Sequence, residues 1–311
     1  MEKSEKKQFV LIDGNAIMHR AYYAMPRFEI NGELVNAIYG FISILFSTIE
    51  KFHPEYLAVA FDVKGPTFRD ALFDKYKATR VKAPDEFYAQ IPEIWKFVEK
   101  MEIPLLTKEG FEADDVIGTI AKRINYQTEN LEVIILTGDQ DTLQLVNGGI
   151  KVAMPKMGRI KEAVYDKSTV LGKFNLTPEQ IIDYKALSGD SSDNIPGVRG
   201  IGAKTATALL REFGSVEKIY QVLDKDEAIF TEKFRSAVVK KLKDGRELAK
   251  LSKQLATIKC DLDLDFKLSQ AKIHDFDEKE VDKFLDKYRF SSLQKRMPKS
   301  VRVNGQQEKL F

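Results

Sequence analysis

The sequence has little cysteine, little histidine and almost no excess of charge, and each shortage excludes a class of protein. One cysteine in 311 residues rules out an internal disulfide framework, and with only three histidines it cannot build a zinc site of the usual ligand spacing. The 49 basic and 47 acidic side chains nearly cancel, so a surface for a polyanion must come from local segregation of charge. With 43% hydrophobic residues, the chain is globular rather than disordered.

Long hydrophobic runs and export signals are also missing. The first eight residues are polar and lysine-rich, and the apolar run after them is short and ends in an acid, which is not a secretory signal. The most apolar long stretch, residues 38–49, is interrupted by small polar residues and is too short to span a bilayer. We therefore expect a cytoplasmic protein without a membrane-spanning segment.

Three short apolar runs are typical of buried strands. They cover residues 9–12, 56–61 and 131–136, and their apolarity is continuous rather than alternating, which favours strands buried on both faces. Helical patterns between them, among others at residues 37–52 and 116–124, indicate crossover connections and a parallel sheet. The sequence therefore predicts an open α/β fold.

The pattern changes near residue 176, after which helices and glycine-rich turns dominate, with one further strand expected at residues 255–259. We expect an α/β domain over residues 1–176 with a basic and aromatic insertion at about 64–95, a helical domain over 177–296 and a flexible tail over 297–311.

Acidic residues follow each predicted strand. Asp13 follows the first and Asp62 the second, while Asp139 follows the third after a short turn. Ligands bind at the carboxyl edge of open α/β sheets, and helix caps or turns explain three such placements poorly. With the acids before the helix at residue 116 and two Asp pairs, the candidate cluster comprises Asp13, Asp62, Glu112, Asp114, Asp115, Asp139, Asp141, Asp190 and Asp193.

Acids gathered at one sheet edge would repel one another, which raises their pKa values and destabilises the fold unless cations neutralise them. Oxygen ligands without histidine or cysteine favour Mg²⁺, with Mn²⁺ as a substitute, and the number of acids favours two ions. Such a pair can activate water and stabilise the leaving oxygen of a phosphodiester, which favours hydrolysis over binding alone. A doubly wound phosphatase is a rival, but Asp13-Gly14-Asn15 differs from its Asp-x-Asp-x-Thr motif.

A glycine-rich turn at residues 197–206 leads into an apolar helix and is similar to a helix-hairpin-helix phosphate clamp. Glycines allow close backbone approach, and the amides at the start of the next helix can face an anion. A tight helix connection is the alternative, and the lack of a preceding strand argues against a P-loop. The candidate DNA-binding residues are Gly197, Arg199, Gly200, Gly202, Lys204 and Thr205.

The insertion interleaves basic and aromatic side chains, a pattern typical of single-strand binding, with a solvated loop as the alternative. A second basic run at residues 233–246 is either a solvated helix face or a contact for duplex phosphates. The basic and aromatic members of the insertion are Lys64, Phe68, Arg69, Phe73, Lys75, Tyr76, Lys77, Arg80, Lys82, Phe87 and Tyr88.

Several motifs follow one another in a fixed order: Ile12-Asp13-Gly14-Asn15, Phe61-Asp62, Tyr76-Lys77-Ala78-Thr79-Arg80, Glu112-Ala113-Asp114-Asp115, Thr137-Gly138-Asp139-Gln140-Asp141, and Gly189-Asp190 through Asp193-Asn194-Ile195-Pro196-Gly197. Jointly they resemble the 5′ nuclease domain of bacterial DNA polymerase I, a member of the flap endonuclease superfamily. The resemblance covers nearly the whole chain.

The resemblance implies a PIN-like parallel-sheet core flanked by helices, a helical arch over the active site and a C-terminal helix-three-turn-helix subdomain. That subdomain grips duplex DNA and can hold K⁺ through backbone carbonyls. By the same resemblance, the nine acids match the family's metal-binding residues, Tyr76, Lys77 and Arg80 match arch residues near the scissile phosphate, and Arg20 matches a position that is often basic.

The activity implied is that of a structure-specific 5′-3′ exonuclease and 5′-flap endonuclease. Such an enzyme hydrolyses DNA and RNA primers by two-metal catalysis during replication and repair. Its partners would be flaps, nicked duplexes and RNA-DNA primer junctions. A PIN-type ribonuclease, which usually lacks the clamp, and a DNA-binding protein without turnover, which leaves the acids unexplained, are the alternatives.

The family's proofreading and polymerase domains are absent, so both a stand-alone nuclease and a piece of a longer polymerase are open. Gln307-Glu308-Lys309-Leu310-Phe311 is similar to peptides that dock on bacterial sliding clamps, with a disordered tail as the alternative.

Overall fold

The computed structural model of the chain describes residues 6–155 and 163–299, and its centre is a six-stranded sheet in the order β5-β4-β1-β6-β7-β8. All neighbouring strands are parallel except β7 and β8. The predicted α/β fold and its three long strands are confirmed. The strands are β1 (Lys7–Asp13), β4 (Tyr56–Ala60), β5 (Leu105–Leu106), β6 (Leu131–Leu136), β7 (Ile150–Met154) and β8 (Ala163–Tyr165), and β2 (Glu29–Ile30) and β3 (Glu33–Leu34) form a separate hairpin.

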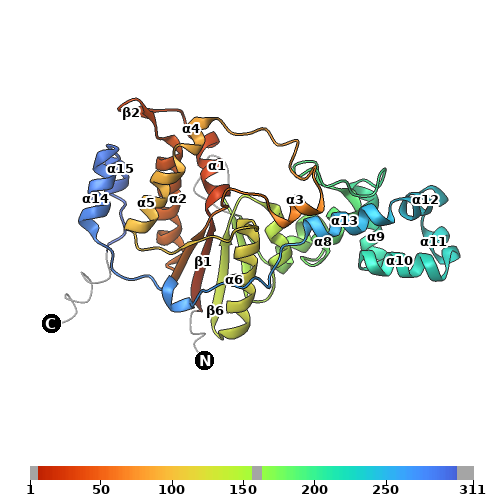
Figure 1. The fold of residues 1–311 in the computed structure, drawn as a ribbon. Helices are drawn as coiled ribbons and strands as arrows, with labels where there is room; N and C mark the ends of the chain where they lie inside the picture. Colours follow the sequence, from red (N-terminus) through yellow and green to blue (C-terminus); the bar gives the residue numbers. More distant parts are fainter. Residues whose placement is uncertain (1–5, 156–162, 300–311) are drawn as a thin grey trace.

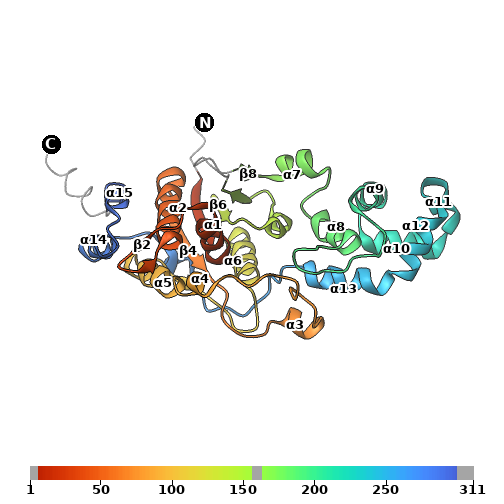
Figure 2. The same ribbon diagram turned by 90° about the horizontal axis from the view of Figure 1, so that it is seen from above.

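Helices surround the sheet and form a second lobe beside it (Figures 1 and 2). In chain order they are α1 (Gly14–Ala24), α2 (Asn36–Phe52), α3 (Phe68–Leu72), α4 (Asp85–Tyr88), α5 (Ile91–Lys100), α6 (Ala113–Gln127), α7 (Lys167–Phe174), α8 (Gln180–Ser188), α9 (Ala203–Phe213), α10 (Val216–Lys225), α11 (Glu227–Lys233), α12 (Ser236–Asp244), α13 (Arg246–Ala256), α14 (Glu278–Lys287) and α15 (Ser291–Gln294). The described residues also include two 3-10 helices, η1 (Gln140–Leu145) and η2 (Leu268–Ala271).

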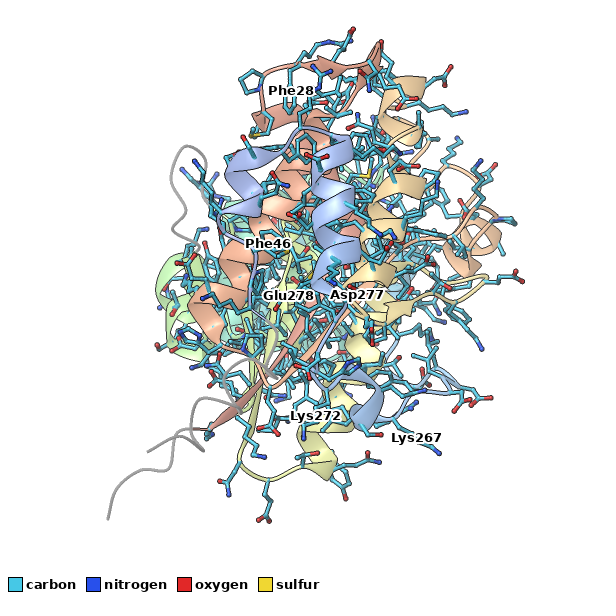
Figure 3. All side chains as sticks on the ribbon, turned by 90° about the vertical axis from the view of Figure 1, so that its left-hand side faces the viewer. Phe28, Phe46, Lys267, Lys272, Asp277 and Glu278 are labelled. Atoms are coloured by element: carbon cyan, nitrogen blue, oxygen red, sulfur yellow. The ribbon has the colours of Figure 1, made fainter. Side chains whose placement is uncertain are left out.

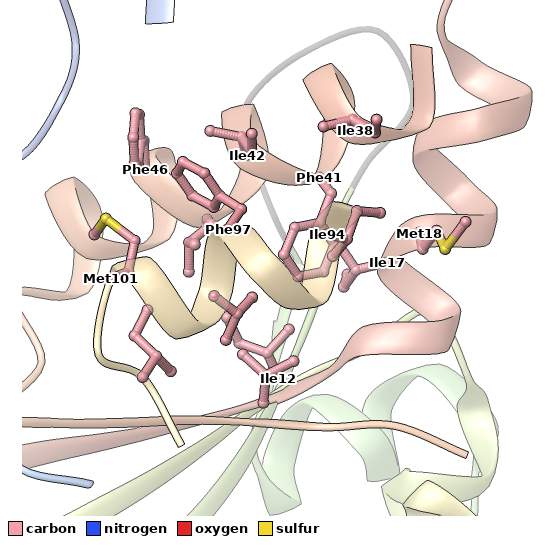
Figure 4. Close-up of a cluster of buried hydrophobic side chains, with 14 of the residues drawn as sticks. Ile12, Ile17, Met18, Ile38, Phe41, Ile42, Phe46, Ile94, Phe97 and Met101 are labelled. Atoms are coloured by element: carbon pink, nitrogen blue, oxygen red, sulfur yellow. The ribbon is translucent and has the colours of Figure 1, made fainter. Parts of the chain in front are cut away.

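Both faces of the sheet are covered, which explains the continuous apolar runs. Successive residues of a strand point to opposite faces. Val10 and Ile12 of β1 therefore join a cluster with α1, α2 and α5, whereas Phe9 and Leu11 join another with α6. Figure 4 shows the first cluster, in which Ile12 lies beneath the side chains of the three helices.

The insertion after β4 rises over the carboxyl edge of the sheet and passes through α3 and α4, so it forms an arch (Figure 1). Only those two short helices are regular, and residues 73–84 between them have no helix. The insertion also ends earlier than the predicted residue 95. Ile94 and Phe97 of α5 are fully buried in the core, so the chain has rejoined the α/β domain by about residue 91.

The helices α8 to α13 form the helical lobe, which has its own core around Leu187, Val198 and Leu209. The sequence predicts that this domain continues to residue 296, and the structure differs. From Ile258 onward the chain returns to the α/β domain, where Phe266 packs on the α6 side of the sheet. The strand expected at residues 255–259 is absent, because α13 extends to Ala256 and the next residues form no strand.

The returning segment ends in α14 and α15, which cover α2 and α5. Figure 3 looks onto these two helices, with Asp277 and Glu278 at the start of α14. Val281, Phe284 and Leu285 are buried against the first core cluster because they form one apolar stripe of α14. Met297 also packs there, so the chain is still part of the fold where the flexible tail was expected to begin.

The proposed clamp-binding peptide at residues 307–311 lies outside the described residues. Across the described ranges, no helix combines the length and apolarity that crossing a membrane requires.

Candidate active site

The carboxyl ends of β4, β1 and β6 bring three of the predicted acids together, because these strands are neighbours in the sheet. Asp13 ends β1, caps α1 and accepts a hydrogen bond at 2.7 Å from the hydroxyl of Thr137. The same hydroxyl accepts one at 3.0 Å from the backbone N–H of Asp139. Asp62 Oδ1 accepts one at 2.7 Å from the N–H of Ala113, at the start of α6.

The start of α6 adds two more acids to this group. Burial raises the pKa of Asp114 well above its usual value, and the negative charges of Asp13, Asp139 and Glu112 raise it further. Asp114 Oδ1 is buried and has no hydrogen-bond partner in residues 6–155 or 163–299. Burial also raises the pKa of Asp13 to about 7, although its hydrogen bonds oppose the shift. The carboxyl groups at this edge therefore lie close enough to disfavour one another's ionisation.

Asp141, Asp190 and Asp193 line a cleft of about 570 Å³ beside Asp139. Lys185 of α8 lies between two of them, paired with Asp141 and, at 2.5 Å, with Asp190. Burial opposes ionisation of Asp190, but hydrogen bonds from Lys185 and Ser192 lower its pKa to about 2. Lys185 is not among the residues predicted from the sequence, because nothing in the local pattern of α8 distinguishes it from other helical lysines.

At the base of the arch, the phenol of Tyr76 and the cationic groups of Lys77 and Arg80 contact the predicted acids. Lys77 Nζ lies 2.5 Å from Glu112 Oε1, and Arg80 Nη2 lies 2.5 Å from Asp193 Oδ1. The hydroxyl of Tyr76 lies 3.2 Å from Glu112 Oε2 and 3.3 Å from Asp193 Oδ2. All three arch residues predicted from the resemblance therefore contact predicted acids.

Two other predicted residues, Asp115 and Arg69, have partners that differ from the prediction, whereas the role of Arg20 stays a prediction. Arg20 is half-buried on α1, two helical turns after Asp13. Asp115 is fully buried, and its carboxylate is bound to Arg69 rather than directed at the other acids. Arg69, predicted to follow a nucleic-acid strand, is itself buried and cannot do so in this position.

The glycine-rich turn joins α8 to α9 through a tight backbone path. Gly197 has a φ of +61°, and a Cβ there would lie 2.2 Å from the backbone N of Gly189, so only glycine fits. Gly200, with a φ of +81°, accepts a hydrogen bond at 3.0 Å from Lys241, a member of the second basic run. This run thus supports the turn from α12.

Gly202 is the N-cap of α9, and no described side chain caps the helix. The first amides of α9, from Ala203 to Thr205, are consequently available to an anion. Arg199 and Lys204 are exposed on the same turn, while Thr205 is half-buried. The turn therefore has the donors and charge of a phosphate-binding site.

The donor chemistry of the edge fits a hard cation, since it offers oxygen ligands only, one buried oxygen without a partner and raised carboxyl pKa values. As the side chains stand, no group of three or more Asp, Glu, His or Cys among the described residues could hold a metal ion. Several carboxylates are paired instead with Lys77, Arg80 and Lys185. We therefore expect ion binding to exchange some of these partners.

The raised pKa of Asp13 predicts a loss of stability with rising pH. The folded protein holds this proton more tightly than the unfolded chain, so the contribution of Asp13 falls as pH rises from about 4 to 7. Asp13→Asn keeps a capping side chain but cannot titrate. We measure the free energy of unfolding by urea in EDTA at pH 5 and at pH 7.5. Between these two pH values it should fall by roughly 2 kcal/mol more in wild type than in the variant. Equal losses would contradict the assignment.

Comparison with known proteins links this geometry to a family. Residues 8–175 match the description "5′-3′ exonuclease, N-terminal resolvase-like domain", and residues 176–279 match "5′-3′ exonuclease, C-terminal SAM fold". A DNA polymerase I from Caldicellulosiruptor bescii is 40% identical over 293 residues, which cover 93% of the chain and 33% of that protein. A 5′-3′ exonuclease from Aquifex aeolicus is 36% identical over 301 residues, which cover 96% of the chain and 98% of that protein.

The match covers only 31–33% of the length of the first polymerase relatives, so the chain spans about a third of each. It covers nearly all of the Aquifex exonuclease. Among solved structures, T5 5′-exonuclease with divalent metal ions (zinc) bound superposes with a TM-score of 0.65 at 22% identity, covering 81% of this chain and 90% of that one. The catalytic core of Rad2 in complex with DNA substrate gives 0.57 at 18% identity, with coverage of 91% and 88%. At these identities the likeness concerns the fold.

Proposed function

The chain belongs to the 5′-3′ exonuclease family, and from that premise we propose that it is a divalent-metal-dependent nuclease that cuts DNA at the 5′ flap or nick of a duplex. One observation carries the proposal. Carboxylates that are distant in the sequence converge at the ends of β4, β1 and β6, next to two arch cations and a glycine-rich turn suited to phosphate.

Eight acids would hold the ions: Asp13, Asp62, Glu112, Asp114, Asp139, Asp141, Asp190 and Asp193. Bound Mg²⁺ would lower the pKa of a water and stabilise the leaving oxygen of the phosphodiester. Lys77 and Arg80 come from the arch base and would stabilise negative charge on the phosphoryl group, since preorganised cations act strongly where water is excluded. Tyr76 would orient Glu112 and Asp193 through its hydroxyl.

The DNA path follows from the positions of the arch and the turn. The turn from Gly197 to Thr205 would hold phosphates of the downstream duplex at the start of α9. The 5′ strand would then leave the duplex and pass under the arch at residues 64–90, above the carboxyl edge of the sheet (Figure 1). K⁺ bound by backbone carbonyls of the turn and a sliding clamp bound by residues 307–311 are further proposals, carried over from the resemblance.

Cleavage of a 5′-labelled flap oligonucleotide tests the function. We expect product with Mg²⁺ and a loss of product with EDTA or with Asp139→Asn, because EDTA removes the ions and the variant removes one carboxylate from the proposed centre. Cutting at the wild-type rate under both control conditions would refute the assignment of the centre. Cleavage of RNA alone would favour a PIN-type ribonuclease, and flap binding without product would favour a DNA-binding protein.

The proposed duplex contact predicts a change in salt dependence. Lys204→Ala should weaken duplex binding several-fold and reduce the slope of log Kd against log salt by about 1, since one phosphate contact is lost. Fluorescence anisotropy between about 50 and 200 mM KCl measures this slope. Lys279→Ala is the matched control, because Lys279 is exposed on α14, away from the turn (Figure 1). An unchanged slope in Lys204→Ala would place the duplex elsewhere.

A further inference from the structure

Arg69 lies in α3 at the base of the arch, yet only 2% of its surface is exposed. Building on the nuclease function proposed above, we propose that Arg69 is a positioning residue that fixes the Glu112 carboxylate relative to the helical lobe. In this arrangement Asp115 is the counterion of Arg69 rather than a metal ligand.

The guanidinium uses all five of its N–H groups. It binds Asp115 twice, from Nη1 to Oδ2 at 2.7 Å and from Nη2 to Oδ1 at 2.9 Å, and it reaches Glu112 Oε2 from Nη1 at 3.2 Å. The other two bonds go to carbonyl oxygens at the end of α13, from Nε to Leu255 at 2.9 Å and from Nη2 to Thr257 at 3.0 Å. The last carbonyls of a helix lack partners and carry partial negative charge, so they stabilise a buried cation.

Asp115 has no acceptor capacity left for a metal ion. Besides its two bonds to Arg69, Oδ1 accepts the backbone N–H of Lys259 at 2.8 Å, and Oδ2 accepts that of Glu112 at 3.1 Å. A carboxylate accepts about four hydrogen bonds, and all four places are filled here. Its sequence neighbour Asp114 shows the opposite situation, with one buried oxygen that has no partner in the described residues.

The helix α13 connects Arg69 to the proposed duplex-binding turn. It packs along α8, and the hydroxyl of Ser252 near its centre accepts the N–H of Gly197 at 2.9 Å. The next helical turn ends at the carbonyls bound by Arg69. Two buried hydrogen bonds at either end of this part of α13 and the bond from Arg69 to Glu112 therefore connect Gly197 with the acid cluster. In our proposal, this connection fixes the position of Glu112 relative to the turn.

The first experiment uses thermal melting in EDTA to decide whether Asp115 is the counterion of Arg69 or a metal ligand. Removing the charge of an acid that only repels its neighbours should raise Tm, whereas removing the counterion of a buried arginine should lower it. We expect Asp115→Asn to lower Tm by about 5 °C or more and Asp114→Asn to raise it. A rise in both variants would overturn the assignment of Asp115.

The second experiment tests positioning with Arg69→Lys, which keeps the charge but cannot span Asp115, Glu112 and two carbonyls. Single-turnover cleavage of the flap with Mg²⁺ should slow by about 30- to 100-fold, because small misplacements of a catalytic group have effects of this size. Binding of the flap, measured by anisotropy in EDTA, should stay within about threefold of wild type.

Lys253→Gln is the matched control, because Lys253 of α13 pairs with Asp183 of α8 and Glu217 of α10 and makes none of the bonds in this connection. It should lower Tm while cleaving at close to the wild-type rate. If Arg69→Lys likewise had a lower Tm but cleaved at close to the wild-type rate, the positioning role would be refuted. If wild type failed to cut the flap, the nuclease function itself would fail, whereas the melting experiment would still decide the role of Asp115.

Discussion

Replacing Asp114 with asparagine should slow cleavage by orders of magnitude and, without divalent cations, make the fold more stable. Its buried carboxylate has an oxygen without a described partner, and burial together with Asp13 and Asp139 raises its pKa. Asparagine has the same shape but no charge, so the repulsion disappears along with a candidate ion ligand. We expect a rate loss of roughly 10³-fold, about 4 kcal/mol in the barrier, and a rise in Tm of about 2–4 °C.

Two measurements on the same preparation test this pair of effects. Single-turnover cleavage of the labelled flap with Mg²⁺ gives the rate, and melting in EDTA gives the stability. Asp286→Asn is a suitable control because Asp286 is exposed on α14, far from the acids. A variant with less than a tenfold rate loss, or with a lower Tm than wild type in EDTA, would show that Asp114 is a structural acid.

Lys77→Met should slow cleavage by roughly 10²- to 10³-fold while DNA binding changes little. The ammonium lies 2.5 Å from Glu112 Oε1, and the backbone N–H of Lys77 is held at 2.9 Å by the carbonyl of Asp193. With a φ of +54°, this residue has a costly left-handed conformation, which is typical of functional sites. Methionine bears the same strain and a similar length, so the variant removes chiefly the charge.

Rapid-quench single-turnover kinetics and anisotropy in EDTA distinguish the two possible roles of Lys77. Lys279→Met is the control, since Lys279 is exposed on α14 and lies outside the proposed DNA path. A weaker affinity with an unchanged single-turnover rate would mean that Lys77 attracts the DNA backbone and takes no part in the chemical step.

The parallel sheet could be predicted because each central strand is apolar on both faces, and only a strand covered on both sides has that pattern. The surface against which α14 packs could not be predicted. Val281, Phe284 and Leu285 indicate that one side of this helix is buried, but the same stripe would suit the helical lobe or the α/β domain equally well. Which surface covers a stripe depends on tertiary packing that a local pattern does not contain.

The candidate site shows the same division. Strand ends fix where Asp13, Asp62 and Asp139 lie, so their convergence was accessible from the sequence. The partners of the acids were not. Lys185 is 44 residues from Asp141, and Arg69 is 46 from Asp115. In the sequence, Lys185 looks like an ordinary lysine of a helix, and Arg69 looks like one of the basic residues of the insertion. Only the folded chain shows that Lys185 pairs with two candidate acids and that Arg69 is buried.

The return of the chain at Ile258 limits how the two halves of the molecule can move. The lobe from α8 to α13 leaves the α/β domain after α7 and re-enters it before η2, so it is tethered at two points. A body held by two tethers can rock about the line that joins them but cannot swing freely, as a terminal domain on one linker can. Two chain connections therefore restrict how far the spacing between the turn and the acids can change.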